Sequence, residues 1–335
     1  MSRTIFVAWA RLSRRTRDLA RELDAKLVFI PDRPPYIRAW RKTKTVIESE
    51  KPDIVLIQLP QGPLLWRITQ LSKKLGFHIV ADVHSGFIVY NSVKELLLNA
   101  LFRKLLHQAD FVLSHNPPFT RLLIKKLKLH RDKVLTVYDP LPKPPKTQKK
   151  PAIADELDNY IVIPASWAPD EPLEYIAKEF LASKVAREYQ LVITGNLKRN
   201  PKLAKRIQNL VDYCAKKRVI LSGYLDDAEY SWLIHHSQAI IAATTKEYTM
   251  LSAIWESIAY NKLFLVSRTA TLKEVIGNEY PCFFTIRRGE IARVIDSCMS
   301  DKSNIRKHIE HTFNNLINKS ISSLNALKSK LYRLV

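Results

Sequence analysis

Glycine is scarce in this chain, which has 7 glycines in 335 residues, whereas glycine makes up about 7% of an average protein. Neither a GxGxxG nor a GxxxxGK[ST] pattern occurs. Those patterns form the loops that wrap the phosphates of dinucleotides and of nucleoside triphosphates. The sequence therefore excludes the usual glycine-rich phosphate loops.

Long apolar runs are absent as well. No stretch of about 18 consecutive apolar residues occurs, which is the length a membrane-spanning helix needs. The apolar start of the chain, Thr4–Val7, leads directly into the basic segment Arg11–Arg21. We therefore expect neither a spanning helix nor a signal peptide, and we expect the protein to stay in the cytoplasm.

Cysteine is rare and unevenly spaced. The three cysteines are Cys214, Cys282 and Cys298. Their odd number and wide spacing favour reduced structural thiols over a disulfide framework or a metal site. The sequence also has no convincing DxD pair or His/Cys cluster, so we expect neither a metal nor another cofactor.

Positive charge is abundant, and it is concentrated in the first half. Residues 1–150 have 29 Lys and Arg against 12 Asp and Glu, a net charge of +17, whereas residues 151–335 have 25 against 20, a net charge of +5. Such a field attracts acidic lipid, nucleic acid or phosphorylated substrates. The alternative is a charge that only serves solubility.

The chain has the length and the apolar content of two domains. A proline- and lysine-rich segment, residues 140–152, breaks every periodicity and reads as a linker. It separates a first domain, 1–139, from a second, 153–303. We expect residues 304–335 to form a pair of helices that packs back towards the first domain. Short buried strands alternate with helices in both domains, which predicts an α/β fold of two doubly wound parallel sheets facing a central cleft.

The stretch 239–276 shows this alternation most clearly. A buried strand, Ala239–Ala243, is followed by a polar loop, a helix that begins near Thr249 and a second strand, Leu263–Ser267. This is the pattern of a right-handed βαβ unit in a parallel sheet. Ligands of such sheets bind beyond the carboxyl ends of the strands, where the N–H groups of helix N-termini attract phosphate.

In this stretch Glu247 follows a strand and Glu256 lies on the next helix. The arrangement resembles the donor-site signature of GT-B glycosyltransferases of the family 4 type. The resemblance implies that Glu247, as the first acid of the E-x7-E pattern, meets the donor sugar, and that Glu256 holds the nucleotide ribose. The spacing here is one residue longer, and Tyr248 stands where the family has glycine. The bland alternative is a solvated loop acid and a surface glutamate.

The same resemblance extends over most of residues 155–280 through the ordered series ASWxPDEP, ITGN, LSGY, TTKE and WES. It implies a donor site made of Glu256 together with Ser166, Gly195, Asn196, Lys198, Arg199, Thr249, Met250 and Leu251. The family usually has an Arg and a Lys after the first strand of this domain to neutralise the donor diphosphate. Here the segment Pro164–Pro172 supplies only Asp170 and Glu171.

Two groups of the first domain are further candidates. His84 follows a predicted strand and is, by the resemblance, a catalytic residue near the acceptor, with Asp82 as a possible acid or structural partner. Three arginines, Arg11, Arg14 and Arg15, lie near a helix N-terminus, where cations oppose the helix dipole and suggest a grip on an acidic acceptor. Exposed, solvated arginines are the alternative.

Two helices of the first domain bear on membrane contact. Residues 93–107 fit either a buried helix, which their composition favours, or a helix lying on a membrane interface. The segment Arg121–Lys133 alternates leucines with basic residues and is the stronger candidate. The resemblance implies docking on anionic lipid through such an element, because enzymes of this type are often monotopic. Peripheral contact with the inner face of the cell membrane is therefore part of the hypothesis.

On these grounds the sequence predicts transfer of a sugar from a nucleotide sugar to an acceptor glycan or lipid-linked glycan, with retention at the anomeric carbon. Two alternatives stay open. One is a sugar-nucleotide epimerase, and the other is a degenerate GT-B binding protein that docks membrane or nucleic acid through its basic half. Nucleic acid is disfavoured, because the basic residues are not interleaved with an aromatic platform or a recognition motif.

Overall fold

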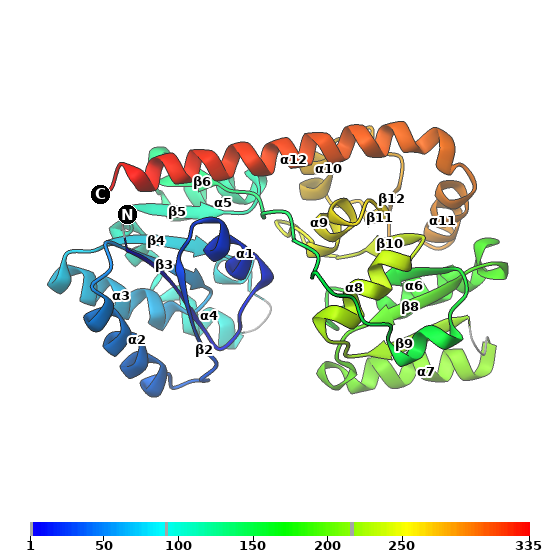
Figure 1. Ribbon diagram of the computed structural model, residues 1–335, viewed down its shortest axis with the longest axis horizontal. Coiled ribbons are helices and arrows are strands. Elements are labelled where there is room, and N and C mark those ends of the chain that lie inside the picture. The colour runs from blue at the N-terminus through cyan, green and yellow to red at the C-terminus, as the bar shows by residue number, and fades with distance from the viewer. Residues whose placement is uncertain (1–2, 91–92, 215–217) are drawn as a thin grey trace. The chain divides into compact units, whose positions relative to one another are not determined.

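The computed structural model describes residues 3–90, 93–214 and 218–335. The chain divides into two compact units, Met1–Pro140 with Ile317–Val335, and Leu141–Leu316. Each unit is built around a six-stranded sheet in which every described strand pair is parallel (Figure 1). No helix among the described residues has the length and apolar character needed to cross a membrane.

The sheet of the first unit has the strand order β2-β1-β3-β4-β5-β6. Its strands are β1 (Thr4–Trp9), β2 (Lys26–Ile30), β3 (Ile54–Leu59), β4 (His78–Val83), β5 (Phe111–Ser114) and β6 (Val134–Thr136). Its helices are α1 (Arg14–Glu22), α2 (Ile37–Glu50), α3 (Gly62–Leu75), α4 (Val93–Ala100) and α5 (Pro117–Leu127), with short 3-10 turns η1 (Ser85–Phe87), η2 (Arg103–Gln108) and η3 (Arg131–Lys133). The central strand β3 is buried along its whole length, because helices cover both faces of a parallel sheet.

Helix α12 (Lys302–Tyr332) contributes to the core of the first unit. Leu327 and Leu331 pack with Phe6 of β1 and Leu19 of α1, and Figure 1 shows this part of α12 on the face of the sheet opposite α2 and α3. The predicted pair of helices is wrong, because residues 302–332 form one helix of 31 residues. The stretch contains neither glycine nor proline, so it has no residue that would end a helix.

The predicted buried helix over 93–107 is also wrong. Helix α4 ends at Ala100, and the 3-10 turn η2 takes over from Arg103. Val93 and Leu97 have exposed fractions of 72% and 67%. The prediction of burial came from the large number of apolar residues in this segment. Their number does not show whether they lie on the buried or the exposed face of the helix.

The sheet of the second unit has the strand order β12-β11-β10-β7-β8-β9. Its strands are β7 (Tyr160–Ile163), β8 (Gln190–Thr194), β9 (Val219–Gly223), β10 (Ala239–Ala242), β11 (Leu263–Ser267) and β12 (Phe283–Phe284). Its helices are α6 (Leu173–Ala182), α7 (Pro201–Cys214), α8 (Asp227–His236), α9 (Ser252–Ala259), α10 (Ala270–Ile276) and α11 (Glu290–Ser300), with the turns η4 (Ala152–Glu156), η5 (Val185–Arg187) and η6 (Leu197–Arg199).

The strand order of this second sheet reverses between β7 and β10. The chain continues from β7 to β8 and β9 on one side, and from β10 to β11 and β12 on the other. The loops after β7 and β10 therefore run to opposite sides of the sheet and leave a crevice beyond the carboxyl ends of the strands.

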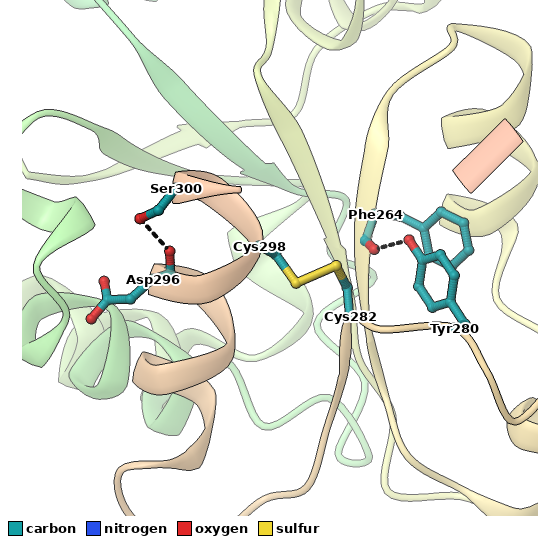
Figure 2. Close-up of a disulfide and its surroundings, with 6 residues drawn as sticks. All are labelled: Phe264, Tyr280, Cys282, Asp296, Cys298 and Ser300. Carbon is teal, nitrogen blue, oxygen red and sulfur yellow. Dashed lines mark hydrogen bonds between the residues drawn. A yellow bond between two sulfur atoms is a disulfide. The ribbon is translucent and has the colours of Figure 1, made fainter. Parts of the chain in front are cut away.

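A disulfide joins Cys282 and Cys298 (Figure 2), and the Cα atoms of the two residues are 6.1 Å apart. Cys282 precedes β12, Cys298 lies on α11, and both are buried. Next to it the Tyr280 hydroxyl donates to the carbonyl of Phe264. The prediction of reduced thiols is therefore wrong for these two cysteines, because a spacing of 16 residues in sequence does not reveal that α11 folds back onto the strand. The side chain of Cys214 lies outside the described residues.

Thiol titration tests the disulfide. Of the three cysteines, two are bonded, so protein denatured without reductant is expected to show one reactive thiol per chain, and all three after reduction. The double variant Cys282→Ala/Cys298→Ala should lower the free energy of unfolding by about 3 kcal/mol, the value typical of a loop of this length. Three reactive thiols before reduction would contradict the bond.

Candidate functional site

A cavity of about 460 Å³ lies at the carboxyl ends of the central strands of the second unit. We call it the β7–β10 cavity. It is bounded by the residues that follow β7, β8, β9 and β10, and by the start of α9. The residues lining it are Pro164, Ala165, Ser166, Ala168, Asp170, Glu171, Thr194, Gly195, Tyr224, Leu225, Tyr230, Ala242, Ala243, Thr249, Met250, Leu251, Ser252, Ala253 and Glu256. The cavity thus coincides with the crevice that the strand order creates.

Glu256 is the charged residue of α9, and it lines the cavity. Its side chain is buried, with 5% of its surface exposed. One carboxylate oxygen accepts a hydrogen bond from the hydroxyl of Tyr230, which lies on α8 and also lines the cavity. A buried carboxylate with a fixed orientation is suited to accept hydrogen bonds from ligand hydroxyls. The structure thus places this predicted donor-site residue at the cavity.

The start of α9 forms another wall of the cavity. Thr249, Met250 and Leu251 line it as predicted, and so do Ser252 and Ala253 of the first helical turn. No side chain caps the helix at Leu251. The N–H of Ile254 donates to the carbonyl of Leu251 at 3.1 Å, so the N–H groups of Ser252 and Ala253 are the ones that a helix start directs towards a ligand.

Helix α9 begins at Ser252, three residues later than the sequence pattern predicts. The backbone of Tyr248 adopts a left-handed conformation with φ of 60°. Its N–H donates to the hydroxyl of Thr271 at 2.8 Å. Residues 248–251 therefore lie before the helix and connect it to the loop after β10.

Gly195 brings the loops after β7 and β8 together. Its φ is +97°, and a Cβ atom at this position would lie 2.0 Å from the carbonyl oxygen of Ala165, so only glycine fits. Ser166, on the same wall, donates from its backbone N–H and its hydroxyl to Glu171, at 2.9 and 2.6 Å. Both predicted residues therefore shape the cavity, and the hydroxyl of Ser166 is already bonded within the loop.

The other predicted residues of this loop do not line the cavity. Asn196 accepts a hydrogen bond from the backbone N–H of Lys198 at 3.0 Å and so caps the turn η6. Lys198 and Arg199 lie on that turn with exposed side chains.

Glu247 caps a different helix. Its carboxylate accepts hydrogen bonds from the backbone N–H groups of Ala270 and Thr271, at 2.8 and 3.0 Å, and from the Thr271 hydroxyl at 2.7 Å. Partial burial acts to raise the pKa of Glu247, but the hydrogen bonds from Thr271 and Ala270 outweigh it and the pKa is lowered. Glu247 thus stabilises the start of α10, and it is not among the residues lining the cavity.

Two further carboxylates, those of Asp170 and Glu171, line the cavity, and no pattern in the sequence predicted a place for them there. Asp170 forms an ion pair with Lys246 at 2.9 Å and accepts a hydrogen bond from the Thr244 hydroxyl at 2.8 Å. It thereby ties the loop after β7 to the loop after β10. Burial raises the pKa of Glu171, although Ser166 and Ala168 donate hydrogen bonds to it. No signal in the sequence connects Asp170 with Lys246. The two residues are 76 positions apart, and no motif or periodicity relates them.

The charge of the cavity lining is one-sided. Asp170, Glu171 and Glu256 contribute carboxylates, and none of the described residues that line it is Lys or Arg. An anionic ligand bound there would depend on backbone N–H groups and on cations from outside the lining. Within residues 3–90, 93–214 and 218–335, no three His, Cys, Asp or Glu side chains come together as a metal site.

In the first unit, Arg15 joins the ends of two strands. Its guanidinium contacts Asp82, at the end of β4, at 3.0 Å, and Asp139, beyond β6, at 2.7 Å. It also donates to the carbonyl of Val137 at 2.7 Å. With 7% of its surface exposed, Arg15 is a buried cross-link, and this geometry does not match the predicted grip on an acceptor.

His84 lies next to this cross-link. Its Nε2 atom is 3.2 Å from Asp82 Oδ2, and its side chain is partly exposed. Burial would raise the pKa of Asp82, but Arg15 and His84 lower it to about 2. The ionised Asp82 therefore holds the ring of His84 in one orientation.

The other two predicted arginines lie on the same edge of the unit. Arg14 is 3.8 Å from Asp18, an i,i+4 contact on α1, and Arg11 is exposed. Of the three, Arg11 is thus the most accessible to a partner.

Acid unfolding tests the buried cross-link. The ionised Asp82 contributes stability that is fully present above the unfolded-state pKa of about 4 and is lost as the pH falls towards its folded pKa of about 2. Arg15→Met leaves buried carboxylates without their cation and should lower the free energy of unfolding at neutral pH by about 3–5 kcal/mol. Denaturant unfolding from neutral to acidic pH measures both effects.

Arg17→Met is the matched control, since Arg17 is exposed on the same helix and its replacement should change stability by about 0.5 kcal/mol or less. The difference between wild type and Arg15→Met should shrink as Asp82 becomes protonated. A difference that stays constant down to low pH would contradict the role of the Arg15–Asp82 pair.

No protein-family model and no curated protein sequence matches the chain. Solved structures match it over nearly its whole length. HepE of Anabaena, in complex with UDP and glucose, aligns with a TM-score of 0.77 and 11% identity over 99% of this chain and 100% of that one. A glycosyltransferase from Rickettsia africae aligns with 0.73 and 15%, and sucrose-phosphate synthase from Thermosynechococcus elongatus with 0.72 and 13%, each over 99% of this chain and 98% of the other.

At these identities the likeness establishes the fold and leaves the activity to be argued from the site. The two parallel six-stranded sheets with their flanking helices match the GT-B architecture of these structures. The predicted fold class is therefore confirmed, and the chain has the GT-B fold of two Rossmann-like domains.

Proposed function

We propose that the chain transfers a sugar from a nucleotide-sugar donor to an acceptor glycan or lipid-linked glycan, and that the donor nucleotide binds in the β7–β10 cavity. The observation that carries this proposal is the position of Glu256. Its buried carboxylate lines the cavity on the same helix whose uncapped first turn also lines it. One site thus offers a carboxylate that accepts hydrogen bonds from ligand hydroxyls and backbone N–H groups that donate hydrogen bonds to phosphate.

The spacing of these two features suits a nucleoside phosphate. Glu256 lies four residues beyond Ser252, which is about one helical turn, roughly 5.4 Å along the axis. A ribose bound to the carboxylate would therefore place its 5′-phosphates near the first-turn N–H groups. Tyr230 holds the carboxylate ready for the two ribose hydroxyls, so little ordering is left to occur on binding.

The phosphates would be neutralised without a cation in the lining. The N–H groups at the start of α9 supply partial positive charge. Lys198 and Arg199 are exposed on the turn η6, three and four residues after Gly195 of the cavity lining, and would turn towards a bound diphosphate. Preorganised N–H groups and these side chains would stabilise the charge that develops on the leaving diphosphate.

The reaction itself replaces one bond at the anomeric carbon of the sugar. The bond to the diphosphate oxygen breaks, a bond to the acceptor hydroxyl oxygen forms, and the hydroxyl proton leaves with the diphosphate or through a base. His84, oriented by Asp82, is our proposed residue near the acceptor. By resemblance to family 4 enzymes the sugar is transferred with retention of configuration.

Nucleotide binding tests the donor site. HepE was solved with UDP, so UDP is the first ligand to try, followed by GDP, ADP and dTDP and their sugars. A nucleotide at about 100 times its dissociation constant should stabilise the wild type by roughly 2.7 kcal/mol. Glu256→Gln keeps the shape of the side chain but removes its charge, and it should weaken binding by about 10- to 100-fold because charge-assisted bonds to ribose are lost. A thermal-shift titration measures both.

Glu174→Gln is the matched control, because Glu174 lies on α6, pairs with Lys178 and Arg206, and does not line the cavity. Glu247→Gln separates the cap from a role at the sugar. A capping role predicts a loss of stability of about 1 kcal/mol with the binding of both the nucleotide and the nucleotide sugar kept, whereas a role at the sugar predicts weaker binding of the nucleotide sugar alone. Equal nucleotide affinity of wild type and Glu256→Gln would contradict the assigned site.

A second candidate is a GT-B binding protein that does not transfer sugar. Two observations favour it: none of the described lining residues is Lys or Arg, and the Glu247 carboxylate is engaged by α10. Release of nucleoside diphosphate from a nucleotide sugar distinguishes the two. Binding without turnover, with every acceptor class tried, would favour this candidate.

A further inference from the structure

Helix α4 exposes its apolar side chains and buries a polar one, the opposite of the usual amphipathic helix. Val93 and Leu97 are four residues apart on the helix and therefore lie on one side of it, with exposed fractions of 72% and 67%. Leu101, directly after the end of the helix, has an exposed fraction of 83%. The polar Asn99 is on the buried side, with 1% exposed, and its Oδ1 accepts a hydrogen bond from the N–H of Gly62 at 3.0 Å. The apolar stripe thus faces away from the core of the unit.

The packing beneath α4 fixes this orientation. A Cβ atom on Gly62 would lie 2.6 Å from the carbonyl oxygen of Leu98 and 2.5 Å from the ring of Phe102. Glycine at the start of α3 therefore allows α4 to lie directly on it. Rotating α4 to bury its leucines would break the Asn99 bond and leave that amide without its backbone partner.

The apolar surface continues through aromatic residues onto α3 and α2. The ring centroids of Trp66 and Phe102 are 6.2 Å apart. The guanidinium of Arg67 lies 4.2 Å from the ring centroid of Trp66 and 5.4 Å from that of Trp40. Ile37, one turn before Trp40 on α2, has an exposed fraction of 56%. We give the name α4 surface to the apolar and aromatic residues of α2, α3, α4 and the two positions after α4; they are Ile37, Trp40, Trp66, Val93, Leu96, Leu97, Leu101 and Phe102.

Cations surround this surface. Arg38 and Arg41 are exposed on α2, and Lys104 is exposed just beyond Leu101. The first 150 residues carry 29 Lys and Arg against 12 Asp and Glu. A second copy of this chain would present the same positive field and be repelled, whereas an anionic surface would be attracted.

We propose that the α4 surface docks the protein on an anionic lipid bilayer. Leucine side chains at the tip of the stripe would enter the boundary between headgroups and acyl chains, as those of interfacial helices do. Trp66 and Trp40 would lie at headgroup depth, where tryptophan is enriched. The exposed arginines and Lys104 would meet the lipid phosphates, each contributing about 1 kcal/mol near such a surface.

The proposal differs from the sequence prediction, which favoured Arg121–Lys133. In that segment Leu123 and Leu129 are buried, and the exposed positions are mostly the basic ones. Helix α5 therefore has charge without an exposed apolar stripe, and we assign the docking to α4. The proposal does not depend on the donor site in the second unit.

Cosedimentation of the full chain with vesicles tests it. The protein is expected to bind vesicles of phosphatidylcholine mixed with phosphatidylglycerol, more weakly at high salt, and to bind pure phosphatidylcholine poorly. The double variant Leu97→Ser/Leu101→Ser should lower the partition coefficient at least about tenfold, because two leucines lose their apolar burial. Ile321→Ser, at a 52% exposed position of α12, is the matched control and should bind like the wild type.

Both leucines are exposed, so the double variant should keep the melting temperature and the circular dichroism spectrum of the wild type. Leu97→Ala/Leu101→Ala, with a smaller reduction in binding, serves as a second variant. Equal binding of wild type and double variant would overturn the proposal, as would failure of the wild type to bind anionic vesicles or equal binding to neutral ones. A dimer in solution that the double variant dissolves would assign the surface to a second copy instead.

Discussion

The reversal of strand order between β7 and β10 is the constraint on which the proposed donor site depends. The loops after these strands run to opposite sides of the sheet and leave room between them. Asp170 then joins the two loops, through its ion pair with Lys246 and its hydrogen bond from Thr244. The carbonyl of Asp170 also accepts a hydrogen bond from the N–H of Thr245 at 2.8 Å. The topology therefore leaves the β7–β10 cavity open, and Asp170 fixes the two loops that bound it.

The same contact explains the unusual charge of the cavity. Lys246 is the basic residue of the loop after β10, and its ammonium group is bound to Asp170, so it is held in the scaffold. The remaining carboxylates are each engaged by hydrogen-bond donors, Glu256 by Tyr230 and Glu171 by Ser166. Polar groups that are already satisfied and oriented cost little to reorganise when a ligand binds. The N–H groups at the start of α9 are then the main attraction for an anion.

The sequence predicts the fold well, because parallel strands buried on both faces read as short apolar runs and recur between helices. It also predicts that residues 249–251 and Glu256 lie beyond the carboxyl ends of the strands, since this follows from the order of strand, loop and helix, although α9 begins three residues later than predicted. It fails where side chains of distant segments meet. The engagement of Glu247 by α10, the burial of Arg15 between Asp82 and Asp139, and the disulfide between Cys282 and Cys298 all depend on contacts that no periodicity records. The outward stripe of α4 was missed because one buried amide, Asn99, decides the rotation of the helix.

The central claim is that the β7–β10 cavity holds the nucleotide of a sugar donor. Hydrogen exchange of the full chain, measured by mass spectrometry with and without UDP, tests it most directly, because backbone amides report where the ligand binds. The account predicts slower exchange in residues 164–171, 194–196 and 249–256, and the same measurement on Glu256→Gln should show this protection much reduced. Protection confined to other segments, or no protection at a UDP concentration that stabilises the protein, would contradict the assignment.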